Sequence, residues 1–167
     1  MRQIYYYNTL LCNLIGIMSN LKLNSIFKTV CIASDHAGFN LKEDIKNHLV
    51  NKKVSIFDIG PYTNKSVDYP DYARKLGNRI KRKKSDVGIL VCGSGTGMAI
   101  SANKIKTIRA AVCYNLNSTR LSRQHNNANI IALGARLTKK KLSLKLVEEF
   151  LRTKFEGGRH LKRIKKI

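Results

Sequence analysis

A cysteine stands directly before three alternating glycines in the segment Cys92-Gly-Ser-Gly-Thr-Gly97. Alternating glycines let the backbone curl so that several N–H groups face one point, which makes an anion site at the start of a helix. The anion can be a phosphate or an oxyanion that develops during a reaction. A helix N-terminus also lowers the pKa of a thiol, so Cys92 is a candidate base. The alternative is a buried, unreactive cysteine at a strand end.

This glycine segment does not fit the common nucleotide-binding motifs. A dinucleotide motif needs Gly or Ala where this chain has Met98 or Ile100, and it needs an acidic residue about 20 residues further on. No Asp or Glu occurs between Val87 and Val147, and no GKS or GKT sequence follows the glycines. If the loop holds a reacting oxyanion, the base from this stretch is therefore Cys92 or His125.

A carboxylate and an imidazole lie side by side in Ser34-Asp-His-Ala-Gly38. Asp35 and His36 could share proton transfer and the binding of hydroxyl groups. The segment fits equally well as a helix N-cap, with Ser34 or Asp35 as the capping residue and His36 exposed.

Two further segments carry groups that could bind or transfer protons. His125 stands before an expected strand and could lie at the active edge of the sheet, although a lone histidine is more often structural. Arg159 and Arg163 are four residues apart, so a helix would place them on one face, and paired guanidinium groups bind a phosphate dianion well. The alternative for the two arginines is a solvated basic tail.

The elements that must position these residues alternate along the chain. Short apolar runs predict strands at 29–33, 54–59, 87–92, 108–113 and 129–133. Amphipathic patterns predict helices at 38–50, 69–83, from the glycine loop to 104, at 119–125 and at 138–153. In the first of these helices, charged residues such as Lys42 stand between the apolar positions. We therefore expect an α/β fold, a Rossmann-like three-layer αβα sandwich with a five-stranded parallel sheet, whose ligands bind beyond the carboxyl ends of the strands.

Length and composition indicate one domain of ordinary globular character. The chain has 167 residues and a formal charge of +22. Residues 1–27 read as an extension, either disordered or translated from an upstream start codon with Met18 as the true initiator, and 28–167 read as a single domain with a basic C-terminal tail. The apolar stretch near the N-terminus is too short to span a membrane. The four cysteines show no CxxC spacing, which favours a reducing, cytoplasmic location.

Several segments together resemble ribose-5-phosphate isomerase type B, in the ribose/galactose-phosphate isomerase family. The resemblance runs from about Lys28 to Arg163 and is carried by SDHAGFNLKE (34–43), DYP (68–70), CGSGTGMAISANK (92–104), IRAAVC (108–113), LSRQHNNANIIALGAR (121–136) and FEGGRHLKR (155–163). It implies isomerisation of an aldose to a ketose through a cis-enediolate, without a metal or a cofactor. The substrate pair would be ribose 5-phosphate and ribulose 5-phosphate.

The resemblance also implies a role for each matching residue. Cys92 would be the base that moves a proton between C1 and C2. The catalytic residues would be Cys92, His125 and Ser94, with His125 opening the furanose ring and Ser94 holding the enediolate oxygen together with the 93–97 backbone. The substrate-binding residues would be Asp35, His36, Tyr69, Gly93, Gly95, Thr96, Gly97, Asn126, Arg159 and Arg163, of which His36 and the two arginines would bind the phosphate.

One branch of that family places a glutamate base where this chain has Met98, and that branch lacks the cysteine at position 92. This chain therefore resembles the cysteine branch. The resemblance further implies a homodimer or homotetramer whose active sites are shared between subunits. The alternatives are isomerisation of a six-carbon sugar phosphate, such as allose or galactose 6-phosphate, and a basic nucleic-acid-binding protein. We expect no specific nucleic-acid partner, because the basic residues are spread along the whole chain.

Overall fold

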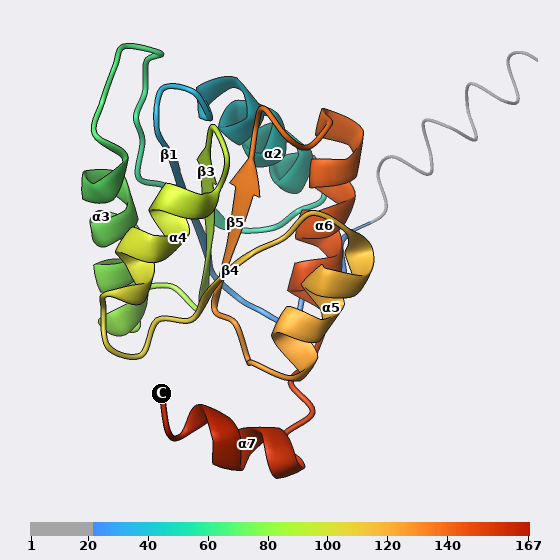
Figure 1. Ribbon diagram of the computed structural model, residues 1–167. Helices are drawn as coiled ribbons and strands as arrows, with labels where there is room; N and C mark the ends of the chain where they lie inside the picture. Colours follow the sequence, from blue (N-terminus) through green and yellow to red (C-terminus); the bar gives the residue numbers. More distant parts are fainter. Residues whose placement is uncertain (1–21) are drawn as a thin grey trace, which may run out of the picture.

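The computed structural model describes residues 22–167 as one layered α/β unit (Figure 1). The strands are β1 (Val30–Ser34), β2 (Ile56–Asp58), β3 (Val87–Cys92), β4 (Ala110–Val112) and β5 (Ile130–Gly134). The helices are α2 (Phe39–Asn51), α3 (Tyr69–Lys81), α4 (Thr96–Asn103), α5 (Leu116–Gln124), α6 (Lys140–Arg152) and α7 (Gly158–Ile164).

All five strands run parallel in the order β2-β1-β3-β5-β4. The central strands β1, β3 and β5 are buried along their whole length, as expected for apolar runs in a sheet with both faces covered. The predicted α/β fold with a five-stranded parallel sheet is therefore confirmed.

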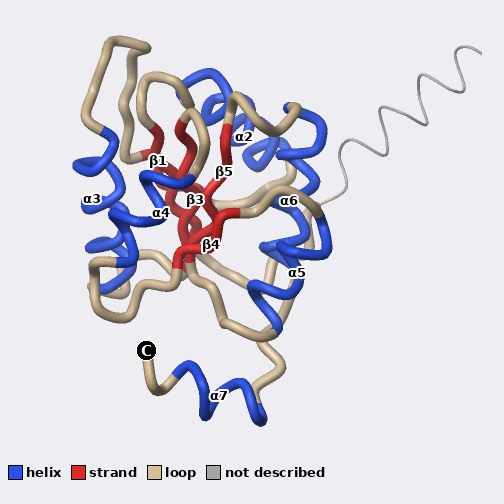
Figure 2. The backbone as a smooth tube through the Cα atoms, in the orientation of Figure 1, coloured by secondary structure: helices blue, strands red, loops and turns tan. Residues whose placement is uncertain are grey.

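Helices cover the two faces of the sheet (Figure 2). An apolar core lies between each face and the helices that cover it. Alternate residues of a strand point to opposite faces, so Val30 and Ile32 pack toward α2 and α6, whereas Cys31 and Ala33 pack toward α3 and α4. Helix α5 lies beside α6. None of the helices within residues 22–167 combines the length and the apolar character that crossing a bilayer requires.

After β1 the chain continues to a strand on one side of the sheet, and after β3 it continues to strands on the other side. Strand β2 lies outside β1, and β5 and β4 lie beyond β3. The loops that follow β1 and β3 therefore diverge from two neighbouring strands, and such a switch point is where parallel α/β sheets bind ligands. Asp35 lies in the first of these loops, and Cys92, the last residue of β3, directly precedes the second.

Both ends of the described chain differ from the sequence-based expectation. Residues 22–27 were assigned to the extension, yet Leu23 is 3% exposed in the core and the Ile26 N–H donates to Leu151 O at 3.0 Å. At the other end, residues 158–164 of the expected tail form helix α7, which lies apart from the layers (Figure 1). The expectations for residues 1–17 and for Met18 lie outside the described residues.

Candidate active site

The thiol of Cys92 lies where β3 meets the N-terminus of α4. The Gly95 N–H donates to its Sγ at 3.1 Å, and the residue is 4% exposed. Gly95 has a φ of 83°, in the left-handed region that glycine favours, and α4 begins at the next residue. The sulfur thus receives an N–H from the turn that starts a helix, an arrangement that stabilises negative charge.

Two other cysteines in the described part of the chain have a different environment. Cys31 and Cys113 are buried in the two apolar cores like Cys92, but their thiols donate to the backbone carbonyls of Val87 and Ala111. Burial raises the pKa of the Cys31 thiol to about 11, and it also raises the pKa of Cys113. Both are therefore protonated at neutral pH, which agrees with their interpretation as small buried apolar residues.

The loop that contains Asp35 is in contact with the end of β3. The Asp35 N–H donates to Val91 O at 3.1 Å, and its carboxylate Oδ1 accepts from the Gly38 N–H at 2.8 Å. Gly38 lies so close to Val91 that a Cβ there would overlap the Val91 carbonyl. Asp35, which is 7% exposed, is therefore held beside the strand that ends in Cys92.

The remaining predicted residues of this edge lie around the two loops. The ring of Tyr69, the first residue of α3, packs against Gly97, where a Cβ would come within 2.9 Å of the ring. His36 is exposed, and its Nδ1 accepts from the Val67 N–H at 3.4 Å. Ser94 and Thr96 are also exposed, and the Ser94 Oγ accepts from the Thr96 N–H at 3.3 Å.

A second group of predicted residues lies at the opposite end of the strands, where the strands begin. His125 ends α5, and the backbone of Asn126 accepts a hydrogen bond from Arg109, which precedes β4. Helix α7, with Arg159 and Arg163, lies at the same end of the molecule, away from the loop between β3 and α4 (Figure 1). Cys92 lies at the carboxyl ends of the parallel strands, whereas His125 precedes a strand and therefore lies at their amino ends. The expectation that the two residues lie at the same end of the sheet is therefore wrong within one chain.

His125 forms a compact cluster with two residues of the following segment. Its ring stacks on that of His160 with 4.3 Å between centroids and 6° between planes. Glu156 Oε2 lies 3.9 Å from Nε2 of His125 and 3.8 Å from Nε2 of His160. Burial, His125 and Arg159 lower the pKa of His160.

These three side chains carry donor atoms of the kinds that bind metals, all within 4.8 Å of one another. The lone pair of an imidazole nitrogen lies in the plane of its ring. The lone pairs of the two nearly parallel rings therefore lie in two separate parallel planes, and one ion cannot lie in both planes unless a ring rotates. With Arg159 and Arg163 on the same segment, this cluster suits an anion better than a cation.

Sequence reasoning missed one cationic residue at the carboxyl ends of the strands, near Cys92. The guanidinium of Arg136 lies 3.5 Å from where a Cβ of Gly93 would stand, and the Arg136 N–H donates to Gly93 O at 3.0 Å. Arg136 follows β5, whose carboxyl end lies beside that of β3. The signal for Arg136 is its place directly after a strand, because every loop that follows a parallel strand opens onto the carboxyl ends of the sheet.

Comparisons with known proteins identify the family. A family model described as Ribose/Galactose Isomerase matches residues 30–167. The chain belongs to this family. Its members include a putative sugar phosphate isomerase of Rickettsia bellii, 46% identical over 138 residues that cover 83% of this chain and 96% of the relative.

Solved structures of ribose/galactose isomerase relatives have the same fold. A ribose 5-phosphate isomerase from Thermotoga maritima is 50% identical, with a TM-score of 0.81 over 83% of this chain and 95% of the other. Ribose-5-phosphate isomerase B from Mycoplasma genitalium, determined with bound ribulose-5-phosphate, is 41% identical, with a TM-score of 0.79 over 83% and 92% of the two chains.

Proposed function

We propose that this protein interconverts ribose 5-phosphate and ribulose 5-phosphate, with Cys92 as the base. Membership in the ribose/galactose isomerase family supports the reaction, as does the relative from Mycoplasma genitalium with its bound ribulose-5-phosphate. The observation that carries the assignment of the base is the position of the Cys92 sulfur. It lies at the N-terminus of α4 and accepts the Gly95 N–H, next to the loop that holds Asp35.

The proposed reaction is a proton transfer between two carbons. In the open-chain aldose, the Cys92 thiolate removes the proton from C2, and the electron pair shifts toward the C1 carbonyl to give a cis-enediolate. The proton of the C2 hydroxyl passes to the oxygen on C1, the Cys92 thiol returns its proton to C1, and the carbonyl forms at C2. The N–H groups of residues 93–97 and the Ser94 hydroxyl stabilise the negative charge on the enediolate oxygen, as in an oxyanion hole.

Other residues of the same edge bind the sugar. Within residues 22–167, the Gly38 N–H on Oδ1 is the protein donor to the Asp35 carboxylate, so Oδ2 is available to a substrate hydroxyl. Tyr69 lines the site above Gly97, and His36 and the Arg136 guanidinium supply polar groups around an anionic substrate.

A second copy of the chain would complete the site with His125, Asn126, Arg159 and Arg163. Strand β5 has five residues, so the two edges of the sheet are roughly 15 Å apart at about 3.3 Å per residue. A general acid or base must lie within hydrogen-bond reach of its substrate, which His125 cannot do for a sugar held beside its own Cys92. A homodimer or homotetramer with shared sites removes this conflict: His125 of one copy opens the furanose ring bound beside Cys92 of another.

The activity is tested by a coupled assay of the purified protein with ribose 5-phosphate in the presence of EDTA. We expect ribulose 5-phosphate to form and EDTA to leave the rate unchanged. A well-folded oligomer without turnover would contradict the proposal and direct the assay to allose 6-phosphate. We further propose a cytoplasmic location, because Cys31, Cys92 and Cys113 are all unpaired and the base must remain a free thiol.

A further inference from the structure

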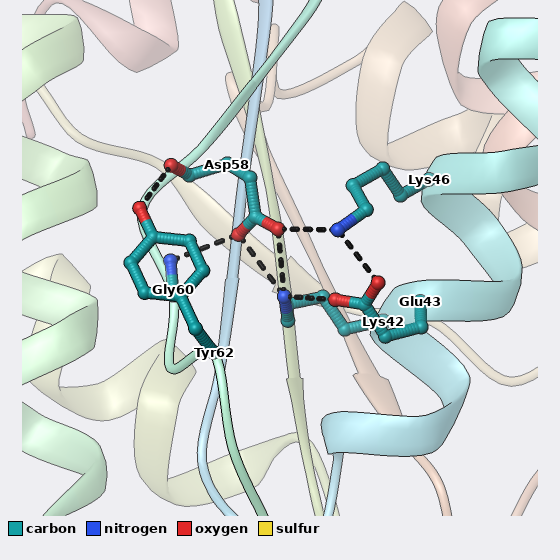
Figure 3. A network of polar contacts seen from close by, with 6 residues as sticks. All are labelled: Lys42, Glu43, Lys46, Asp58, Gly60 and Tyr62. Carbon is teal, nitrogen blue, oxygen red and sulfur yellow. Dashed lines mark hydrogen bonds and ion pairs between the residues drawn. The ribbon is translucent and has the colours of Figure 1, made fainter.

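Helix α2 carries a lysine whose ammonium group is completely buried (Figure 3). The Lys42 side chain is 0% exposed, and its Nζ donates to Glu43 Oε1 at 2.6 Å and to the two oxygens of Asp58 at 3.0 and 2.8 Å. An ammonium group has three N–H donors, so these contacts use all of them. The rings of Phe39 and Tyr62 lie 5.4 and 5.9 Å from Nζ.

A buried ion pair of this kind gives little net stability, because desolvation of the charges offsets their attraction. Its geometry is nevertheless strict, since every donor of Lys42 is committed. Such a network is well suited to fixing the relative positions of the segments that it joins.

Asp58 transmits this position to the loop that follows β2. Its Oδ1 accepts from the Gly60 N–H at 2.8 Å, and its backbone carbonyl accepts from the Tyr62 hydroxyl at 3.0 Å (Figure 3). Burial alone would raise the pKa of Asp58, but hydrogen bonds from Lys42, Lys46 and Gly60 hold it below its usual value. Asp58 is therefore ionised at neutral pH and accepts from all three groups.

The contacts continue from Gly60 to Asp35 and return to Lys42. The Gly60 carbonyl accepts from the Ser34 N–H at 3.0 Å, and Ser34 is bonded to Asp35. The Asp35 carboxylate accepts from the Gly38 N–H at 2.8 Å, and the Gly38 carbonyl accepts from the Lys42 N–H at 2.9 Å. The Asp35 carboxylate is thus one member of a closed circuit that contains Lys42.

We propose that Lys42, acting through Asp58 and Gly60, is a positioning residue that holds the Asp35 carboxylate in the orientation in which Oδ2 binds a substrate hydroxyl. This inference rests on the proposed function, because it assigns a ligand to Asp35. Lys42 does not itself touch the substrate. Removal of the Lys42 ammonium group leaves the Asp35 carboxylate chemically unchanged, but it weakens the contacts that hold the 34–38 segment in position.

A double-mutant cycle with Lys42→Met and Asp35→Asn separates positioning from general stability. We expect Lys42→Met to raise KM for ribose 5-phosphate about tenfold, the effect of losing one charge-assisted hydrogen bond, with kcat changed less than about threefold. Asp35→Asn should also raise KM. Because both changes disable the same contact, the double variant should be no worse than Asp35→Asn alone. Additive effects on KM, or an unchanged KM in Lys42→Met, would overturn the proposal.

Lys46→Met is the matched control. Lys46 also lies on α2 and contacts Asp58 and Glu43, but its side chain is 25% exposed and the Lys42–Asp58 pair stays intact without it. We expect both kinetic constants to stay within about twofold of the wild type, because the Lys46 pairs are partly exposed to solvent and Lys42 still holds Asp58. If Lys42→Met does not fold, Asp58→Asn enters the same cycle with the same expected coupling.

Amide hydrogen exchange gives a readout that does not depend on turnover. The Gly38 N–H should exchange faster in Lys42→Met than in the wild type and in Lys46→Met, because its acceptor is no longer fixed. Unchanged exchange at Gly38 would contradict the positioning role even if the protein proved not to be a ribose-5-phosphate isomerase. Absence of turnover in the wild type would instead contradict the proposed function alone.

Discussion

Gly95 and Gly157 both have a positive φ immediately before a helix, but they differ in ψ and in what surrounds them. Their φ angles are 83° and 70°, and each residue immediately precedes a helix, α4 and α7 respectively. A Cβ on Gly95 would come within 3.1 Å of the Leu133 backbone, whereas nothing lies within 4 Å of a Cβ on Gly157. A side chain is therefore strained by the positive φ at both positions, and of the two only Gly95 would also bring its Cβ into close contact with the backbone.

Gly95→Ala should be destabilising and inactive. We expect a loss of about 3 kcal/mol in the free energy of unfolding, against about 2 kcal/mol for Gly157→Ala, where the backbone is strained but nothing within 4 Å obstructs the Cβ. The close contact with the end of β5 should also displace the Gly95 N–H that donates a hydrogen bond to the Cys92 sulfur. Urea denaturation of both variants checks the difference, and equal losses in stability would show that the contact with β5 is unimportant.

Cys92→Ser should keep the fold and lose turnover. A positioned general base contributes about 10²–10⁴-fold to the rate, and a serine hydroxyl is far less acidic than a thiol, so kcat should fall by that order with little change in KM. Steady-state kinetics with ribose 5-phosphate measures the effect. Cys113→Ala, which removes a buried thiol with a raised pKa, is the control and should retain kcat.

Mixing two inactive variants should restore activity if the sites are shared. Cys92→Ala and His125→Ala each remove one half of the site. A mixed dimer has one intact site out of two, so random reassembly should recover about a quarter of the wild-type activity. The control mixes Cys92→Ala with Ser94→Ala, whose residues lie at the same edge, and should remain inactive. A mixture of Cys92→Ala and His125→Ala that stays inactive would argue for sites built from one chain.

Glu148 should make stability depend on pH in the acid range. Burial would raise its pKa, but the hydrogen bond with His48 and the charges of Lys52 and Arg152 hold the pKa below the usual value. A carboxylate of lowered pKa contributes its stability above its unfolded pKa of about 4.3 and loses it as the pH falls through the folded value.

Glu148→Gln should therefore cost about 1 kcal/mol at neutral pH, and the difference from the wild type should shrink as the pH falls below about 4. Urea unfolding across this range measures it. Asp71→Asn removes a pair with Arg74 in which both side chains are more than half exposed, and serves as a control with little effect. A difference that stays constant into the acid range would contradict the assigned cause.

The sequence predicts the sheet well because its signals are local. Strands β1, β3 and β5 are short runs of branched apolar residues, and the glycines of the 93–97 loop mark the turn into α4. The rule that ligands bind beyond the carboxyl ends of strands then brings Asp35 and Cys92 to one edge, where the structure places them in neighbouring loops.

Features that depend on distant contacts could not be predicted in this way. The amphipathic pattern predicts Lys42 at a polar position of its helix, yet the side chain is fully buried. Its partner Asp58 lies on another element 16 residues away, so the pattern of the helix alone does not reveal the pair. The basic character of residues 158–164 predicts a C-terminal tail, yet these residues form helix α7. The expectation that His125 lies at the same end of the strands as Cys92 is wrong, because a residue that precedes a parallel strand lies at the amino end of that strand.

The separation of Cys92 and His125 also has a consequence for how activity varies with the amount of protein. With sites completed by a second copy, a newly synthesised chain holds only half of the catalytic groups. At concentrations below the dissociation constant of the dimer, the rate then rises with the square of the chain concentration. A chain that lacked both groups would disable both sites of the dimer that it enters, so it would lower the total activity by more than its own share.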